Sequence, residues 1–355
     1  ERDRILSALK HEYVTIPGFT EHQLPEPTLT PADLSAEEWR EALRASKGMV
    51  LRQEVFELDV DALDQGTEDP VRLYTTAYHN SNITRVQPQG INRHAVFLVT
   101  ESEAITYNYE LDLRQTAPNP DPRIAHTLNL KIDELGNVLE SVAVVYPRIG
   151  SDADPSLTPE QWALINQVQK HERHLALNCT GFTADINEPD TYRLRMPCQS
   201  QAWEVTGINP AGQYFTLAEL KSKNLSGNGA SEISYHQVTD GTSQKRLVEC
   251  ARTLFFADDL KTHRPLGQHS PLGLPYESYK LTLTTNLLSS VYVDRERING
   301  AVSALAEQAN HYPVSGYYKG DQVFAGYPIT PEPLEHQYWL ASGKAGFEDD
   351  AAQHF

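Results

Sequence analysis

Residues 128–146 read Leu-Asn-Leu-Lys-Ile-Asp-Glu-Leu-Gly-Asn-Val-Leu-Glu-Ser-Val-Ala-Val-Val-Tyr and contain the clearest structural pattern of the chain. Before Asp133, apolar residues alternate with polar ones, which is the period-two pattern of a half-buried β-strand. Asp133 favours a tight turn, and Gly136 can take the left-handed backbone conformation that a short hairpin loop needs. Four valines and Tyr146 follow. The pattern therefore predicts a strand, a tight turn and a second strand.

A longer alternation lies upstream, over residues 105–113. Nine residues of unbroken alternation are typical of a strand and hard to reconcile with a helix. Before them, residues 95–99 are apolar on both faces, as expected of a separate strand covered on both sides. Short turns between these strands favour an antiparallel meander. One face of residues 105–113 consists of Ile105, Tyr107, Tyr109, Leu111 and Leu113.

The composition limits the class of protein. The 355 residues suffice for two ordinary domains or one large all-β body, and we expect one continuous body. The net charge of −18 disfavours binding to nucleic acid, which needs a basic face, and repels anionic membrane surfaces. No apolar run is long enough for a transmembrane helix. The sequence begins at Glu1, without a Met or a signal-peptide pattern, so we expect a piece of a longer chain.

Helices are predicted from their capping residues. Ser35 and Glu38 form a capping box that opens a helix to about residue 46. A second capping box, at residues 158–161, opens a helix whose buried stripe should contain Trp162 and Ile165. A further helix is predicted over residues 298–311. The expected organisation is an N-terminal extended segment with a capped helix and a first strand (1–70), a β-hairpin region (71–148), a helical insertion (149–174) and further strands with short helices (175–355).

Catalytic and metal-binding motifs are not evident. The sequence contains no nucleophile elbow, phosphate-binding P-loop, dinucleotide fingerprint or His-Glu-x-x-His zinc motif. His171 and His174 fit a solvated helix end better than a zinc site, because no cysteine pair lies near. Asp258 and Asp259 fit a turn better than an acid–base pair. The three cysteines, at positions 179, 198 and 250, do not suggest a disulfide framework and are expected to be buried. We expect no enzyme, metal or cofactor.

Several motifs, in a shared order, resemble one known family. The hairpin region contains Tyr107-x-Tyr109-Glu, residues 121–128 (Asp-Pro-Arg-Ile-Ala-His-Thr-Leu), Asp133-x-x-Gly136 and Tyr146. Further matches are residues 41–55, 192–207, 244–284 and 338–344. Together they resemble the middle-to-C-terminal region of the B component of Tc (toxin complex) insecticidal toxins, which leads into Rhs/YD repeats. The motif residues carried over are Tyr107, Tyr109, Asp121, Arg123, His126, Asp133, Gly136, Tyr146, Tyr276, Tyr279, Trp339 and Gly343.

The resemblance implies a function as well as a fold. It implies a mainly β protein, with a curved antiparallel sheet of the Rhs/YD shell-wall type and a few peripheral helices. The chain would be a non-catalytic wall segment of a hollow shell that encloses a toxic effector polypeptide. Its partners would be the C component that completes the shell, the enclosed effector and, indirectly, the A translocation pore. The toxin would be bacterial and secreted or on the cell surface.

Two alternatives follow from the residues alone. The Tyr107 and Tyr109 stripe could stack against sugar rings in a carbohydrate-binding or glycoside-cleaving β-domain, although an aromatic row is more often sheet packing. The chain could also be a plain adhesin-like structural module without a cavity.

Overall fold

The computed structural model describes residues 13–116, 118–150, 156–284, 286–287, 317–324, 337–344 and 346. The chain divides into two compact units, where the sequence predicts one continuous body. Unit 1 contains residues 1–176 and 209–224, and unit 2 contains residues 177–208 and 225–355. The division falls inside strand β7 (His174–Phe182), so no change of sequence pattern marks it.

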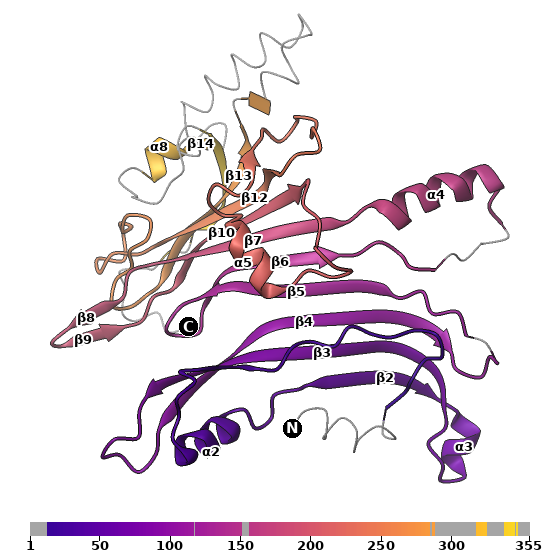
Figure 1. Cartoon of the computed structure of the whole chain (residues 1–355). Helices are drawn as coiled ribbons and strands as arrows, with labels where there is room; N and C mark the ends of the chain where they lie inside the picture. Colours follow the sequence, from indigo (N-terminus) through magenta and orange to yellow (C-terminus); the bar gives the residue numbers. More distant parts are fainter. Residues whose placement is uncertain are drawn as a thin grey trace, which may run out of the picture. The chain divides into compact units, whose positions relative to one another are not determined.

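Unit 1 is built on an antiparallel meander of long strands. Strands β2 to β6 pair in chain order, and they lie side by side and are bowed along their length (Figure 1). A short strand, β1, pairs with β3 in parallel. The mainly β fold with a few helices is therefore confirmed. The elements are β1 (Thr28–Thr30), α2 (Ala36–Ala45), β2 (Arg52–Leu58), α3 (Val60–Asp64), β3 (Pro70–Gln87), β4 (Val96–Asp112), β5 (Arg123–Ile132), β6 (Val138–Val145), α4 (Pro159–His171) and α5 (Leu217–Lys223).

The predicted hairpin of residues 128–146 is confirmed. β5 ends at Ile132 and β6 begins at Val138. In the loop, the Asp133 carboxylate accepts hydrogen bonds from the backbone N–H groups of Leu135 (2.9 Å) and Asn137 (2.8 Å). Gly136 has φ of +91°, the left-handed conformation that a side chain disfavours. Local turn chemistry is thus sufficient to place this connection.

β4 differs from the prediction of two separate strands. Residues 95–99 and 105–113 are largely joined in one strand of 17 residues. The reason is its partner: β3 is 18 residues long and pairs with β4 from Arg72 opposite Asp112 to Gln87 opposite Val96. Val96 is 47% exposed, so the beginning of β4 is not covered on both faces as predicted.

A β-bulge lies near the end of β4. The pairing with β3 shifts between Leu73 opposite Leu111 and Thr75 opposite Asn108. Within this irregular stretch, Glu110 has φ of +92°, a conformation that usually favours glycine. The bulge therefore stores backbone strain at a residue whose side chain is exposed.

The helices begin where the capping boxes predict. In α2, Ser35 and Glu38 form both hydrogen bonds of the box, and the Glu38 carboxylate also binds Arg85 at 3.0 Å. In α4, residues 158–161 form the second box. The predicted buried stripe of α4 is wrong, because no residue of the helix is buried: Trp162 and Ile165 are only partly covered, and Val168 is 42% exposed. Figure 1 shows α4 extending beyond the end of β6, where no sheet face covers it.

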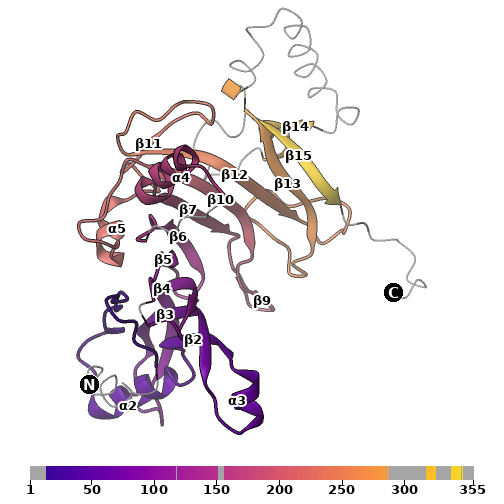
Figure 2. The same ribbon diagram turned by 90° about the vertical axis from the view of Figure 1, so that its right-hand side faces the viewer.

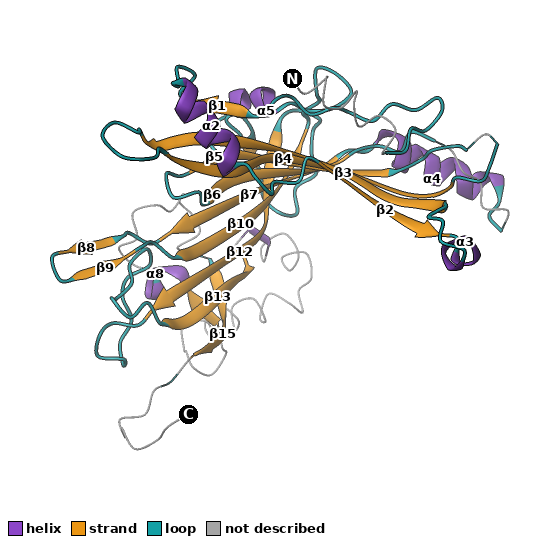
Figure 3. Cartoon of the chain, turned by 90° about the horizontal axis from the view of Figure 1, so that it is seen from below, coloured by secondary structure: helices purple, strands orange, loops and turns teal. Residues whose placement is uncertain are grey.

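Unit 2 is built on largely antiparallel strands. Strands β10, β12, β13, β15 and β14 follow one another across it (Figure 2). β11 pairs with β12 in parallel, and β8 and β9 form a separate hairpin that projects past the sheet (Figure 3). The elements are β8 (Ile186–Glu188), β9 (Thr191–Arg193), β10 (Pro197–Thr206), β11 (Ser231–Glu232), β12 (Gln244–Phe255), β13 (Pro275–Leu283), β14 (Tyr317–Lys319), α8 (Gly320–Val323) and β15 (Tyr338–Lys344).

A close backbone approach fixes the end of β10. Gly207 has φ of +72°, and a Cβ added there would lie 1.8 Å from the carbonyl oxygen of Thr242. Only glycine fits such a contact without moving the backbone.

The helix predicted over residues 298–311 lies outside the described residues. None of the helices in the described part of the chain is long and apolar enough to cross a membrane.

Candidate functional site: a buried tyrosine cluster under the N-terminal segment

Tyr78, Tyr107 and Tyr109 form a buried aromatic cluster on one face of β3 and β4. Tyr107 is 0% exposed and Tyr109 is 7% exposed, as the alternation of β4 predicts. Their rings stack at a centroid distance of 6.1 Å with an interplanar angle of 16°. The ring of Tyr78 meets that of Tyr107 edge-on at 6.5 Å. We call these three residues the tyrosine cluster.

Residues 13–24, the N-terminal segment, cover the cluster. The Glu21 carboxylate accepts hydrogen bonds from the hydroxyl groups of Tyr78 (2.5 Å) and Tyr109 (2.6 Å). The backbone N–H of His22 donates to the Tyr107 hydroxyl at 2.9 Å. Each tyrosine hydroxyl thus has a partner in this segment. Because burial and the adjacent Glu21 charge disfavour the phenolate, they hold the pKa values of Tyr78 and Tyr109 well above their usual range.

Arg52 balances the negative charge of Glu21. Its guanidinium lies 3.4 Å from the Glu21 carboxylate and 2.5 Å from that of Glu54. It also lies over the ring of Tyr78, at 4.8 Å from the centroid. One cation therefore compensates two carboxylates that are each only 10% exposed, which limits the cost of burying them.

A second polar group, around His126, adjoins the cluster. Nε2 of His126 lies 3.4 Å from the Glu103 carboxylate, and both side chains are almost completely buried. Asn80 donates to the same carboxylate at 3.2 Å. Burial works against ionisation of Glu103, but the hydrogen bonds from His126 and Asn80 outweigh it and lower its pKa. Nδ1 of His126 lies 3.1 Å from the Tyr146 hydroxyl.

Residues 209–224, the return segment, complete the site. The backbone N–H of Phe215 donates to the Tyr146 hydroxyl at 3.0 Å. The Tyr214 ring lies 4.9 Å from the rings of both Tyr146 and His22. Burial and the neighbouring His126 lower the pKa of His22. The site therefore joins the meander, the N-terminal segment and the return segment through buried polar contacts.

This arrangement is suited to holding segments together. The tyrosine hydroxyls are engaged, and their raised pKa values oppose formation of a nucleophilic or basic phenolate at neutral pH. The buried faces of Tyr107 and Tyr109 are not presented to a sugar, so the geometry does not favour the carbohydrate-binding alternative. Within the described residues, no group of three or more His, Cys, Asp or Glu side chains is arranged to hold a metal ion.

Other motif residues of unit 1 stabilise loops. Asp121 binds Arg148 at 2.5 Å and accepts hydrogen bonds from the backbone N–H groups of residues 149 and 150. Arg123 is exposed and lies 3.6 Å from Glu110. Asp133 and Gly136 form the hairpin loop. The structure thus brings Tyr107, Tyr109, His126 and Tyr146 into the site and places Asp121, Arg123, Asp133 and Gly136 elsewhere in unit 1.

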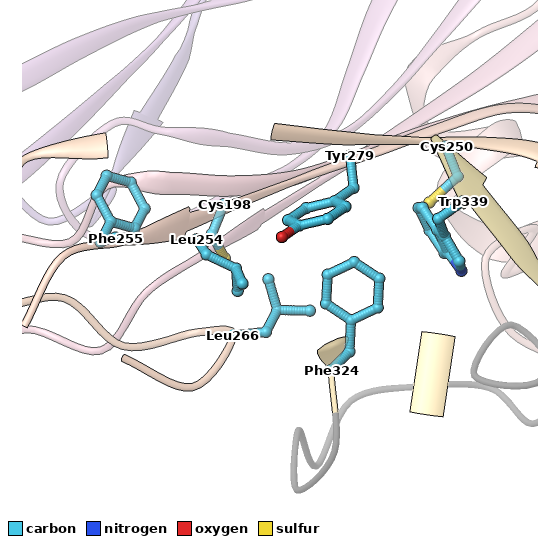
Figure 4. Packing of buried hydrophobic residues seen from close by; sticks show 8 residues of the cluster. All are labelled: Cys198, Cys250, Leu254, Phe255, Leu266, Tyr279, Phe324 and Trp339. Atoms are coloured by element: carbon cyan, nitrogen blue, oxygen red, sulfur yellow. The ribbon is translucent and has the colours of Figure 1, made fainter. Parts of the chain in front are cut away.

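The remaining motif residues belong to unit 2. Tyr279 (3% exposed) and Trp339 (0%) pack in one apolar core, where Phe324 meets the Trp339 ring edge-on at 4.9 Å (Figure 4). Tyr276 packs against Phe256, with ring centroids 4.9 Å apart. Gly343 lies in β15, opposite Ser278. The other members of this core are Cys198, Cys250, Leu254, Phe255 and Leu266.

The cysteines and the acidic pair have structural environments. Cys198 and Cys250 are buried as predicted, whereas Cys179 is only partly buried. Burial raises the pKa of the Cys250 thiol to about 11. Asp259 forms a turn by accepting hydrogen bonds from the backbone N–H groups of residues 261 and 262, which lower its pKa to about 2. The turn interpretation of Asp258 and Asp259 agrees with this geometry.

Sequence reasoning missed several residues of the site. Glu21 and His22 lie in a proline-rich stretch without periodicity, and Tyr214 lies in an irregular loop. Glu103 belongs to the polar part of β4, between the two predicted strands. Only the alternation of aromatic residues in β4 indicated that another segment of the chain must cover Tyr107 and Tyr109.

Comparisons with known proteins give a consistent result. Residues 41–194 match the family described as the insecticide toxin TcdB middle/C-terminal region. No curated protein matches the chain. The crystal structure of TcdB2-TccC3 matches with a TM-score of 0.67 and 18% identity, over 97% of this chain and 15% of that chain.

A Tc holotoxin pore from Photorhabdus luminescens matches with a TM-score of 0.65 and 20% identity, over 96% of this chain and 14% of that chain. At these identities the likeness shows a shared fold. The chain spans about 15% of the length of the first of these solved chains.

Proposed function

We propose that this chain is a wall segment of a hollow β-shell that encloses a toxic effector polypeptide, because residues 41–194 match the middle/C-terminal region of the insecticide toxin TcdB. The observation that carries the proposal is how unit 1 uses its polar side chains. The tyrosine cluster and Arg52 bind Glu21, and these contacts fasten the irregular N-terminal segment to the sheet. A barrier needs such contacts because its irregular segments must stay fixed on the sheet to keep the wall closed. It needs no catalytic centre.

The wall segment is non-catalytic in this proposal. The buried carboxylates pair with Arg52 and His126, and the tyrosine pKa values are shifted away from neutrality, which suits packing and opposes acid–base chemistry. The acidic net charge fits a surface that stays soluble and away from anionic lipid.

The partners follow from the same premise. The shell would be completed by a TccC-type C component, the relative's partner in the solved TcdB2-TccC3 complex. The assembled shell would hold the effector and join a translocation pore in an extracellular toxin. Strand edges of the sheet would be paired by neighbouring parts of the shell, which removes exposed hydrogen-bonding edges.

A matched pair of substitutions on one strand tests the proposal. Val142 and Val145 both lie on β6, but Val142 is 0% exposed and Val145 is 48% exposed. The chain is produced in its full natural polypeptide together with a TccC-type partner, and protease digestion of the effector region is followed. We expect protection in the wild-type and Val145→Asp complexes. Val142→Asp buries a charge in the sheet and should expose the effector to cleavage.

Two results would contradict the wall function. One is an effector region that is cleaved as fast in the wild-type complex as when it is free. The other is full protection in a Val142→Asp complex whose β-sheet content, measured by circular dichroism, has fallen. Glycan binding that Tyr107→Ala abolishes would instead favour the carbohydrate-binding alternative.

A further inference from the structure

A small pocket in unit 1 adjoins the buried site and shares Tyr146 and Tyr214 with it. Its volume is about 240 Å³, and it opens to solvent between the end of β6 and the return segment. Pockets for drug-sized ligands usually measure about 300–1,000 Å³. This pocket therefore suits a smaller group, of the size of one side chain or a small organic acid.

Arg173 gives the pocket a positive charge. Its guanidinium lies over the rings of Tyr146 (5.8 Å) and Phe215 (5.7 Å), which favours a fixed orientation. One terminal nitrogen, Nη1, donates to Asn209 at 2.8 Å. The Nε atom is buried and has no acceptor among the described residues. Because Nε is closed to solvent, an anion in the pocket would be bound by the terminal nitrogens of the guanidinium.

The rest of the lining selects the kind of anion. No acidic side chain lines the pocket. Ile124, Pro147 and Ile149 provide an apolar wall, and Gln213 provides an amide. The guanidinium edge fits the planar oxygens of a carboxylate in a bidentate geometry. A single arginine in a chain of net charge −18 suits a monoanion better than a phosphate dianion.

We propose that this pocket binds one carboxylate group carried on a small apolar or aromatic body, with Arg173 as the anion-binding residue. Such a group could belong to a free organic acid or to an acidic side chain of a polypeptide. The proposal does not depend on the shell function, because it rests on the lining of unit 1 alone. The chain's negative charge opposes the ligand, so weak binding that decreases with salt is expected.

Gly212 offers a way to block the pocket without disturbing the fold. It lines the pocket, and a Cβ added there meets no atom within 4 Å. Gly212→Leu should therefore fill the pocket while Arg173 keeps its contacts. Arg173→Gln removes the charge and the guanidinium fork. Arg123→Gln is the matched control, because Arg123 is an exposed arginine elsewhere in unit 1.

The experiment is a ligand-observed NMR titration of the whole chain with sodium benzoate and with its neutral analogue benzamide. We expect saturable benzoate binding that is at least about tenfold tighter than benzamide binding, since tenfold corresponds to about 1.4 kcal/mol. Arg173→Gln and Gly212→Leu should each weaken benzoate binding by about tenfold or more. Arg123→Gln should leave it unchanged, and thermal unfolding checks that every variant is folded.

A second arm separates the two sources of the carboxylate. Acetyl-glutamate amide represents an acidic side chain of a polypeptide, and benzoate represents a free aromatic acid. Binding of either one that requires Arg173 supports the site and identifies its source. The proposal is overturned if neither carboxylate binds, if benzamide binds as well as benzoate, or if binding survives both Arg173→Gln and Gly212→Leu.

Discussion

Removal of the Glu21 carboxylate should loosen the N-terminal segment from the sheet. Glu21→Ala deletes the acceptor of two hydrogen bonds, from Tyr78 at 2.5 Å and from Tyr109 at 2.6 Å. Both tyrosines are less than one-tenth exposed, and a buried donor left without an acceptor costs about 1–3 kcal/mol. Water can reach part of the opened site, so we expect the free energy of unfolding of unit 1 to fall by about 2–4 kcal/mol.

The measurement must report on unit 1 alone, because a chain of two units need not unfold in one step. Hydrogen exchange of peptides from β3, β4 and residues 13–24 during urea titration meets this need. Glu21→Gln, which keeps an acceptor, should cost less than Glu21→Ala. Arg52 retains Glu54 as a partner in both variants, so its charge is not left alone.

A double-mutant cycle isolates the hydrogen bond. In the Glu21→Ala background, Tyr109→Phe removes a donor that already lacks its partner, so it should cost less than in the wild-type chain. The expected coupling energy is about 0.5–3 kcal/mol. The reasoning fails if Glu21→Ala costs less than about 1 kcal/mol, or if the two substitutions are additive while both variants remain folded.

Three further predictions concern strain and pH. Gly207→Ala should lower the stability of unit 2 by about 2–3 kcal/mol, because the added Cβ clashes with the backbone of Thr242. Gly241 also has positive φ, but a Cβ added there meets no atom, so Gly241→Ala should cost only about 1 kcal/mol in the same urea titration. Glu110→Gly should stabilise unit 1 by about 1 kcal/mol, because it relieves the backbone strain of a left-handed residue. Asn108→Gly, a control on the same strand, should destabilise unit 1 by about 0.5–1 kcal/mol. The reverse order of stabilities would contradict a strained bulge. The lowered pKa of His22 means that the unfolded chain binds a proton more readily below pH 6.5, so stability should decrease as pH falls below that value, and His22→Gln should flatten this dependence in unfolding titrations.

The sequence by itself determined the local structure. The hairpin at residues 132–138, the division of β4 into an apolar and a polar face, and the first residues of α2 and α4 follow from turn residues, alternation and capping boxes. Each of these signals acts over a few neighbouring residues, so one sequence is enough to find it. The order of the motifs also indicated a resemblance to the Tc B component, because several weak matches are more specific when they occur in the same order.

Only the tertiary structure decided the site and its boundaries. Glu21 meets Tyr109 across 88 positions of sequence, and Phe215 meets Tyr146 across 69, at hydrogen-bond distance. No local pattern encodes such pairs, because each partner alone is a common polar or aromatic residue. The same holds for the length of β4, set by β3, for the exposed faces of α4, and for the pocket around Arg173. These features depend on which distant segment covers a surface, and that is settled when the chain packs.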